Sequence, residues 1–193
     1  MSKKKKIWFI TGNQHKFYEI SNSFKNKNLN WHVIKKDLET QELQHPDLKK
    51  VAIFKLKSIL DKFNLSCFIE DAGFFVESPL KGFPGVYSSY IFKTIGNEGI
   101  IKLIDNFEDS VAYFKSVIAL YYQPLEKIFT FEGKVRGKVS SSIRGNQGFG
   151  FDPIFIPEKY PDKTFAELSL EQKNMISHRS KAIEKLTDFL KKS

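Results

Sequence analysis

Cys67-Phe68-Ile69-Glu70-Asp71-Ala72-Gly73 is the stretch around which the fold is organised. Its apolar residues predict a short buried strand that runs into two adjacent carboxylates and then a small-residue turn. Two acidic side chains at the end of a core strand are costly to bury unless a partner neutralises them. A divalent cation is a common partner, because hard metals bind carboxylate oxygens and keep water or phosphate in their other positions. The stretch therefore predicts a metal site at the end of a core strand.

The start of the chain predicts a strand, a turn and a helix. Residues 7–10 are continuously apolar, and Phe17, Ile20 and Phe24 follow with helical spacing. The turn, Thr11-Gly12-Asn13-Gln14-His15-Lys16, would point backbone N–H groups and a helix N-terminus at a ligand, with the Lys16 charge in reach. It matches neither the P-loop nor the dinucleotide fingerprint. Two interpretations therefore stay open, a phosphate cradle and an ordinary capped turn, and the residues alone favour the turn.

The remaining pattern predicts a mixed α/β fold. We expect strands over residues 31–35, 111–122 and 128–139, the last two joined as an antiparallel hairpin, and helices within 87–107, broken near Gly96, and over 178–191. A further helix should bury Val51, Phe54, Ile59, Leu60 and Phe63. Lys55 lies near the edge of that apolar face, so its position favours snorkelling to solvent over reaching inward to a phosphate. Helices would then pack on a sheet that is not wholly parallel.

A glycine-rich loop spans residues 144–153, Arg-Gly-Asn-Gln-Gly-Phe-Gly-Phe-Asp-Pro. Its three glycines would bring backbone close to a ligand, and its two phenylalanines would offer a stacking face. The alternative is a loop whose phenylalanine side chains tuck under it. The residues alone do not decide between these interpretations.

Composition narrows the class of protein. The 193 residues contain 31 Lys and Arg against 22 Asp and Glu, and the net charge of +9 favours either an anionic partner or a solvated surface. The single cysteine, Cys67, excludes an internal disulfide. The apolar run after the basic start is too short for a signal peptide, and no stretch reaches transmembrane length. We expect one domain over residues 1–193, in the cytoplasm and not bound to a membrane.

Several separated motifs, in this order, resemble the inosine triphosphate pyrophosphatase family, also called XTP/dITP diphosphatases. They run from Thr11-Gly12-Asn13-x-x-Lys16 through Glu70-Asp71-Ala72-Gly73 and residues 82–87 to residues 148–155, 164–167, Lys173-Asn174 and Ser177-His178-Arg179. The resemblance covers nearly the whole chain, and the combination is far more specific than any one motif.

The resemblance implies a fold and a reaction. The fold is an elongated mixed sheet with flanking helices, forming two lobes around a central cleft, and the protein is usually a homodimer. The reaction is Mg²⁺-dependent hydrolysis of ITP, dITP or XTP to the nucleoside monophosphate and pyrophosphate, with the small-molecule nucleotide, not nucleic acid, as partner.

The resemblance also implies residue roles. Asp71 would activate the attacking water and, with Glu42, hold Mg²⁺, although Glu39 is a near competitor for the second ligand. The phosphates would be held by Thr11, Gly12, Asn13, Lys16 and Lys55. The base and sugar would be held by Phe149, Gly150, Phe151, Asp152, Lys173, His178 and Arg179. Within these, Phe149 would stack on the base, and donors such as His178 and Arg179 would favour a C6 carbonyl over the amine of adenine.

Two alternatives remain at this point. A related pyrophosphatase would use the same residues on another base, and higher activity on dTTP than on ITP would favour it. A basic chain with 15% aromatic residues would also suit a non-catalytic RNA- or single-stranded-DNA-binding protein. Against that second alternative, most aromatic residues fall on expected core positions, and no RNA-binding signature is present.

Overall fold

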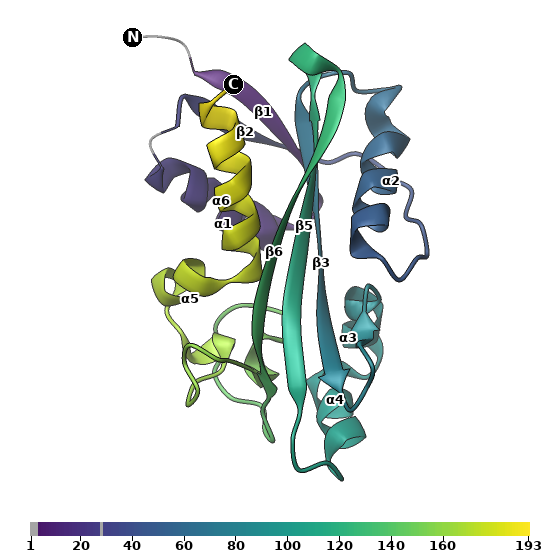
Figure 1. The fold of residues 1–193 in the computed structure, drawn as a ribbon, viewed down its shortest axis with the longest axis vertical. Helices are drawn as coiled ribbons and strands as arrows, with labels where there is room; N and C mark the ends of the chain where they lie inside the picture. The colour runs from purple at the N-terminus through teal and green to yellow at the C-terminus, as the bar shows by residue number, and fades with distance from the viewer. Residues whose placement is uncertain (1–3, 28) are drawn as a thin grey trace. The chain divides into compact units, whose positions relative to one another are not determined.

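The computed structural model describes residues 4–27 and 29–193. In these residues a seven-stranded sheet is flanked by helices, as Figure 1 shows. The strand order is β2-β1-β3-β5-β6-β7, with β4 paired to β3. The strands are β1 (Lys5–Ile10), β2 (Trp31–Lys36), β3 (Cys67–Ser78), β4 (Phe83–Gly85), β5 (Val111–Tyr122), β6 (Lys127–Val139) and β7 (Phe155–Pro157). The α-helices are α1 (Gln14–Asn26), α2 (Leu48–Leu60), α3 (Ser88–Thr94), α4 (Gly96–Ile104), α5 (Leu170–Ile176) and α6 (His178–Lys191).

The sheet mixes strand directions, which confirms the mixed α/β prediction. Strand β1 pairs in parallel with β2 and β3, whereas β3 with β4 and β6 with β7 are antiparallel. The predicted break between the two central helices falls at Gly96, whose φ of +62° a residue with a side chain rarely adopts. Among the described residues, no helix is both long and apolar enough to cross a membrane.

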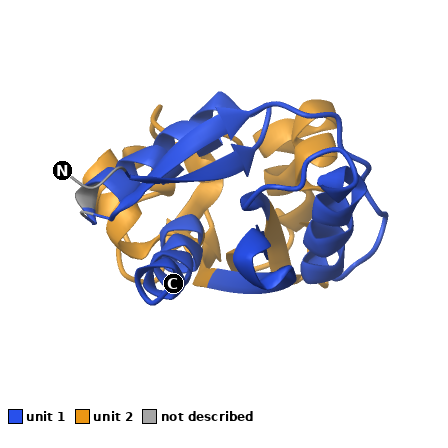
Figure 2. Ribbon diagram, turned by 90° about the horizontal axis from the view of Figure 1, so that it is seen from above, with its two compact units in different colours: residues 1–71, 116–133, 179–193 blue, residues 72–115, 134–178 orange. Residues whose placement is uncertain are grey.

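The chain divides into two compact units, coloured in Figure 2. Unit 1 comprises residues 1–71, 116–133 and 179–193, and unit 2 comprises residues 72–115 and 134–178. Each unit has its own apolar core: that of unit 1 includes Phe9 and Phe68, and that of unit 2 includes Phe74, Phe114 and Phe155. The single domain expected over residues 1–193 stays a prediction.

The predicted turn at Ala72-Gly73 is wrong, because β3 runs through it as one strand of 12 residues, Cys67–Ser78. Glu70 and Asp71 therefore lie within the strand, not at its end. Glycine is needed at position 73 for a reason other than a turn. A Cβ placed on Gly73 would lie 2.5 Å from the carbonyl oxygen of Gly85. Glycine at position 73 thus allows β4 to approach β3 closely.

The apolar face of α2 also differs from the predicted one. Phe54 is 39% exposed, whereas Leu56 is fully buried. Phe63 lies beyond the end of the helix and packs edge-on against Trp8. The helix buries Leu48, Val51, Ala52, Leu56 and Ile59, so its core-facing stripe is rotated from the predicted one.

Candidate active site

The turn before α1 is held by its own polar side chains. Asn13 is the N-cap: its Oδ1 accepts the backbone N–H of Lys16 at 3.0 Å, and the Thr11 hydroxyl oxygen accepts the N–H of Asn13 at 3.0 Å. A Cβ on Gly12 would lie 3.2 Å from a carboxylate oxygen of Asp37. The capped turn is therefore present, and it places a helix N-terminus beside the Lys16 side chain.

Lys16 reaches from α1 to β3. Its ammonium donates to the backbone carbonyl of Glu70 at 3.0 Å and lies 2.9 Å from a carboxylate oxygen of the same residue. The side chain is 18% exposed, so the charge lies at the edge of the core. An ammonium that is held in this way needs little reordering to meet an anion.

The Glu70 side chain is fully buried and lies in a network of charges within unit 1. It accepts the Ser116 hydroxyl at 2.6 Å and the Arg179 Nε at 3.2 Å, and a second nitrogen of Arg179 binds Glu19. Burial alone would raise the pKa of Glu70, but Arg179 and Lys16, with the Ser116 hydrogen bond, hold it well below the ordinary value. Glu70 is therefore an anion that organises two cations.

Asp71 has the opposite environment. Among the described residues, its buried Oδ2 accepts no hydrogen bond, and the Lys55 ammonium lies 3.9 Å from it. Burial raises the pKa of Asp71; Lys16 and Lys55 lower it, but Glu70 and Glu42 add to the rise. A carboxylate oxygen that lacks a donor is suited to accept a proton or to bind a cation.

Lys55 does not snorkel, contrary to the interpretation that its position favoured. Its ammonium binds the Glu42 carboxylate and faces Asp71. Burial on its own would lower the pKa of Lys55, but the charges of Asp71 and Glu42 outweigh it and raise that pKa. These three residues lie in separate segments of unit 1 and together form a carboxylate–ammonium–carboxylate cluster.

The two carboxylates of the cluster are suited to a hard divalent cation. Glu42 and Asp71 offer hard oxygen ligands, and Asp71 Oδ2 has no hydrogen-bond partner among residues 4–27 and 29–193. In the described part of the chain, no group of three or more His, Cys, Asp and Glu side chains is placed to hold a metal. Two carboxylates without a full cage are typical of Mg²⁺ sites, where water and substrate phosphates complete the coordination.

In unit 2, Asp152 organises the glycine-rich loop. The carboxylate is buried, and its Oδ2 accepts the backbone N–H of Phe149 at 2.8 Å and the Lys173 ammonium at 2.8 Å. Gly148 has a φ of +77°, and a Cβ there would lie 2.1 Å from the same oxygen. The Lys173 ammonium lies 5.4 Å from the centre of the half-buried Phe149 ring. The structure thus brings Phe149, Asp152 and Lys173 together.

The other predicted residues of unit 2 have mainly supporting contacts. The Phe151 ring is buried and packs against Phe74 and Phe92, so this phenylalanine tucks under the loop. The carbonyl of Gly150 accepts the side-chain amide of Asn97 at 3.2 Å. The His178 ring stacks on Phe114 with centroids 4.8 Å apart. Of the two loop phenylalanines, Phe149 is therefore the better candidate for stacking on a ligand.

The chain is similar to proteins of a known family. The model of the Ham1 family matches residues 7–189. The chain belongs to the Ham1 family. A dITP/XTP pyrophosphatase of Pyrococcus horikoshii is 45% identical over 186 residues, which cover 96% of this chain and 97% of that protein. A dITP/XTP pyrophosphatase of Thermococcus kodakarensis is 43% identical over 188 residues, covering 97% and 98%. The solved structure of the Staphylococcus aureus Ham1 protein is 32% identical, covers 97% of this chain and 99% of its own, and has a TM-score of 0.82.

Membership of the Ham1 family confirms the resemblance seen in the motifs. Sequence reasoning nevertheless missed Glu19 and Ser116, and it treated Glu70 only as a neighbour of Asp71. A signal was present: Ser116 lies inside the largely apolar run of β5, and Glu19 lies next to buried Ile20 on α1. Polar residues within buried runs indicate a satisfied internal network.

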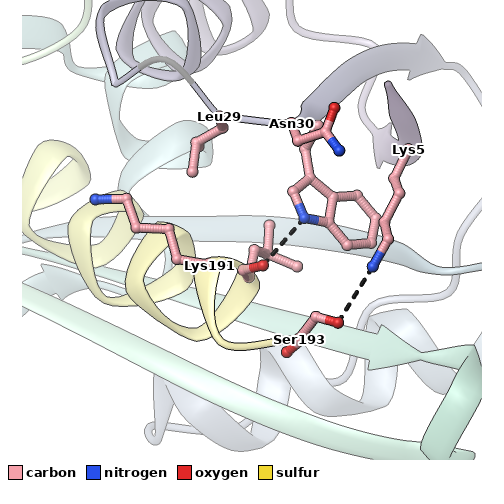
Figure 3. Close-up of a pocket in the computed structure, with 7 residues that line it drawn as sticks. Lys5, Leu29, Asn30, Lys191 and Ser193 are labelled. Atoms are coloured by element: carbon pink, nitrogen blue, oxygen red, sulfur yellow. Dashed lines mark hydrogen bonds between the residues drawn. The ribbon is translucent and has the colours of Figure 1, made fainter. Parts of the chain in front are cut away.

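A hollow of about 310 Å³ lies elsewhere in unit 1, and Figure 3 shows its lining. There the Trp31 indole N–H donates to the carbonyl of Leu190 at 3.1 Å, and the Lys5 ammonium donates to Ser193 at 3.2 Å. None of the predicted site residues lines it. We therefore assign it no part in substrate binding.

Proposed function

We propose that this protein hydrolyses non-standard purine nucleoside triphosphates (ITP, dITP and XTP) to the nucleoside monophosphate and pyrophosphate. The observation that carries the proposal is the cluster in unit 1, where two lysines and an unsatisfied carboxylate gather beside a helix N-terminus. Two relatives over 40% identical along nearly their whole length are named dITP/XTP pyrophosphatase. The enzyme is accordingly a nucleoside-triphosphate diphosphatase of the Ham1 family.

The phosphate end of the substrate is assigned to unit 1. A triphosphate carries about four negative charges, so catalysis depends mainly on positioning and charge neutralisation. Lys16, Lys55 and the N-terminus of α1, with Thr11 and Asn13 in its cap, supply positive charge and N–H donors. The net charge of +9 assists the approach of such an anion.

Proton transfer is assigned to Asp71. Its raised pKa makes the carboxylate a better base than an exposed aspartate, and its Oδ2 accepts no hydrogen bond from the part of the chain that the structure describes. Glu42 and Asp71 would hold Mg²⁺, which when bound neutralises phosphate charge and lowers the pKa of a bound water. The pairing of Lys55 with Glu42 supports Glu42 over Glu39 as the second ligand.

The base is assigned to the loop of unit 2. Phe149 offers a ring for stacking, while Asp152 and Lys173 fix the loop that carries it. Selection of a C6 carbonyl by His178 and Arg179 stays a prediction. The guanidinium of Arg179 already binds Glu70 and Glu19, so its contribution to selection would come through that network or its remaining N–H groups.

The test measures pyrophosphate release from ITP, XTP, GTP, ATP and dTTP, with and without Mg²⁺. We expect rapid release from ITP and XTP only with the metal. Activity on dTTP above that on ITP would indicate a pyrophosphatase with another base preference. No release from any nucleotide, together with a gel shift of RNA at physiological salt, would replace the enzyme with a nucleic-acid-binding protein.

We also propose a homodimer. Helix α3 buries none of its residues, and apolar side chains in and around it are exposed, including Tyr90 at 68%, Tyr87 at 46% and Ile95 at 42%. Several exposed apolar side chains in and around one short helix are consistent with a protein–protein interface. Sedimentation velocity should give a dimer for the wild type and a monomer for Tyr90→Asp; a monomeric wild type would reject the proposal.

A further inference from the structure

Lys55 is placed where a cation would otherwise bind. Its ammonium binds the Glu42 carboxylate directly and lies 3.9 Å from the Asp71 carboxylate. The side chain is 19% exposed, and it leaves α2 between the buried residues of that helix. The same two carboxylates are the ones assigned to Mg²⁺. In this structure the two carboxylates have a counter-ion that is part of the protein.

An internal counter-ion changes how a metal can bind. A divalent ion between Glu42 and Asp71 must either displace the Lys55 ammonium or bind beside a charge that repels it. The Lys55 side chain is only 19% exposed, so leaving the two carboxylates without a new partner would strand its charge at the edge of the core. Displacement therefore needs another anion to receive the ammonium. A triphosphate is such an anion.

We propose that Lys55 occupies the Glu42–Asp71 pair in the free enzyme and transfers its ammonium to the substrate's phosphates when nucleotide arrives. A divalent cation then binds the two carboxylates tightly only together with nucleotide. This inference rests on the proposed function, because it takes the triphosphate as the receiving anion. The proposal implies positive coupling: bound nucleotide should increase the affinity for the metal, and bound metal should increase the affinity for nucleotide by the same factor.

Lys16 does not fill the same position. Its ammonium is bound by the carbonyl and carboxylate of Glu70, which is buried and already paired with Arg179. Removing Lys16 would therefore leave the Lys55 bridge in place. The same helix offers a cleaner control in Lys57, which is exposed. Lys57→Met deletes one positive charge from α2 without touching the carboxylate pair.

The experiment titrates Mn²⁺ into the free protein and follows the unbound ion by electron paramagnetic resonance, at constant ionic strength. Without nucleotide, Lys55→Met should bind Mn²⁺ at least about tenfold more tightly than the wild type, a change of about 1.4 kcal/mol. Lys57→Met and the charge-preserving Lys55→Arg should behave as the wild type does. With a non-hydrolysable α,β-imido analogue of ITP, affinity for Mn²⁺ should rise strongly in the wild type and much less in Lys55→Met.

A second readout needs no nucleotide and no turnover. Mg²⁺ alone should raise the melting temperature of Lys55→Met by more than that of the wild type, because it replaces a lost counter-ion. Equal or weaker Mn²⁺ binding by Lys55→Met, with the variant folded by circular dichroism, would overturn the inference. If the wild type releases pyrophosphate from ITP in that case, the proposed function stands. If it releases none, the function falls, whatever the titration gives.

Discussion

Replacing Glu70 by glutamine is the sharpest test of how the site is supported. The substitution keeps the shape of the side chain and removes one charge from a set of four, in which Glu19 and Glu70 balance Arg179 and Lys16. The Glu70 side chain is fully buried, and that of Arg179 is 3% exposed, so water cannot replace the lost charge. The variant therefore leaves a net positive charge in or at the edge of the core.

Breaking a buried ion pair from one side costs about 3–5 kcal/mol. In a chain of this length, that lowers the melting temperature by about 6–20 °C. The matched control is Glu184→Gln, which removes a carboxylate that is 64% exposed and 3.8 Å from Lys27. A surface pair of this kind contributes under about 1 kcal/mol, so Glu184→Gln should unfold almost as the wild type does.

The pH dependence gives a second, independent check. The pKa of Glu70 is lowered in the folded protein, so its contribution to stability is fully present above its ordinary pKa of 4.5 and is lost as the pH falls toward the folded value. Urea unfolding at pH 7 and pH 3.5 should show the deficit of Glu70→Gln shrinking by about 1 kcal/mol at the lower pH. A deficit under 1 kcal/mol at pH 7, or one that grows on acidification, would refute the reasoning.

Three further predictions concern single side chains. Asp71→Asn should lower the turnover of ITP at least about 100-fold. It should leave the melting temperature unchanged or higher, because the lost charge is buried and Oδ2 accepts no hydrogen bond from the described residues. Near-normal turnover would remove Asp71 from the mechanism. Phe149→Ala should raise the KM for ITP about tenfold or more through lost stacking, and an unaltered KM would show that the ring does not contact the base. Cys67 is buried, and burial raises its thiol pKa to about 12. Iodoacetamide at pH 8 should therefore label it only after unfolding, as followed by mass spectrometry. If the folded protein is labelled as fast as the unfolded one, the packing of β3 is contradicted.

Much of the fold follows from local pattern. Strand β5 has the predicted bounds, Val111–Tyr122, and α6 has the predicted bounds, His178–Lys191. These elements repeat a hydrophobic period over many residues, so the pattern alone identifies the buried face. In α2, by contrast, the prediction placed Phe54 in the core although it is exposed.

The course of β3 could not be predicted, because distant residues decide it. Two acids followed by alanine and glycine have low strand propensity. The strand continues because Ser116, Arg179 and Lys16 satisfy Glu70, and because β4 requires a residue without a side chain at position 73. The same holds for Lys55: helical position favours solvent, whereas the carboxylates of Glu42 and Asp71 draw it inward.

The strand conformation explains why two adjacent acids have different tasks. Consecutive side chains of a strand point to opposite faces. Figure 1 shows α1 and α6 on one side of the sheet and α2 on the other; Glu70 meets residues of the first pair of helices, and Asp71 faces Lys55 of α2. Among the described residues, each acid has one oxygen that accepts no hydrogen bond, but that of Glu70 lies 2.9 Å from the Lys16 ammonium, whereas that of Asp71 lies 3.9 Å from the Lys55 ammonium. A turn after Asp71, as predicted from the sequence, would not impose that alternation. The continuation of β3 therefore separates Glu70, which supports the structure, from Asp71, which is assigned to catalysis.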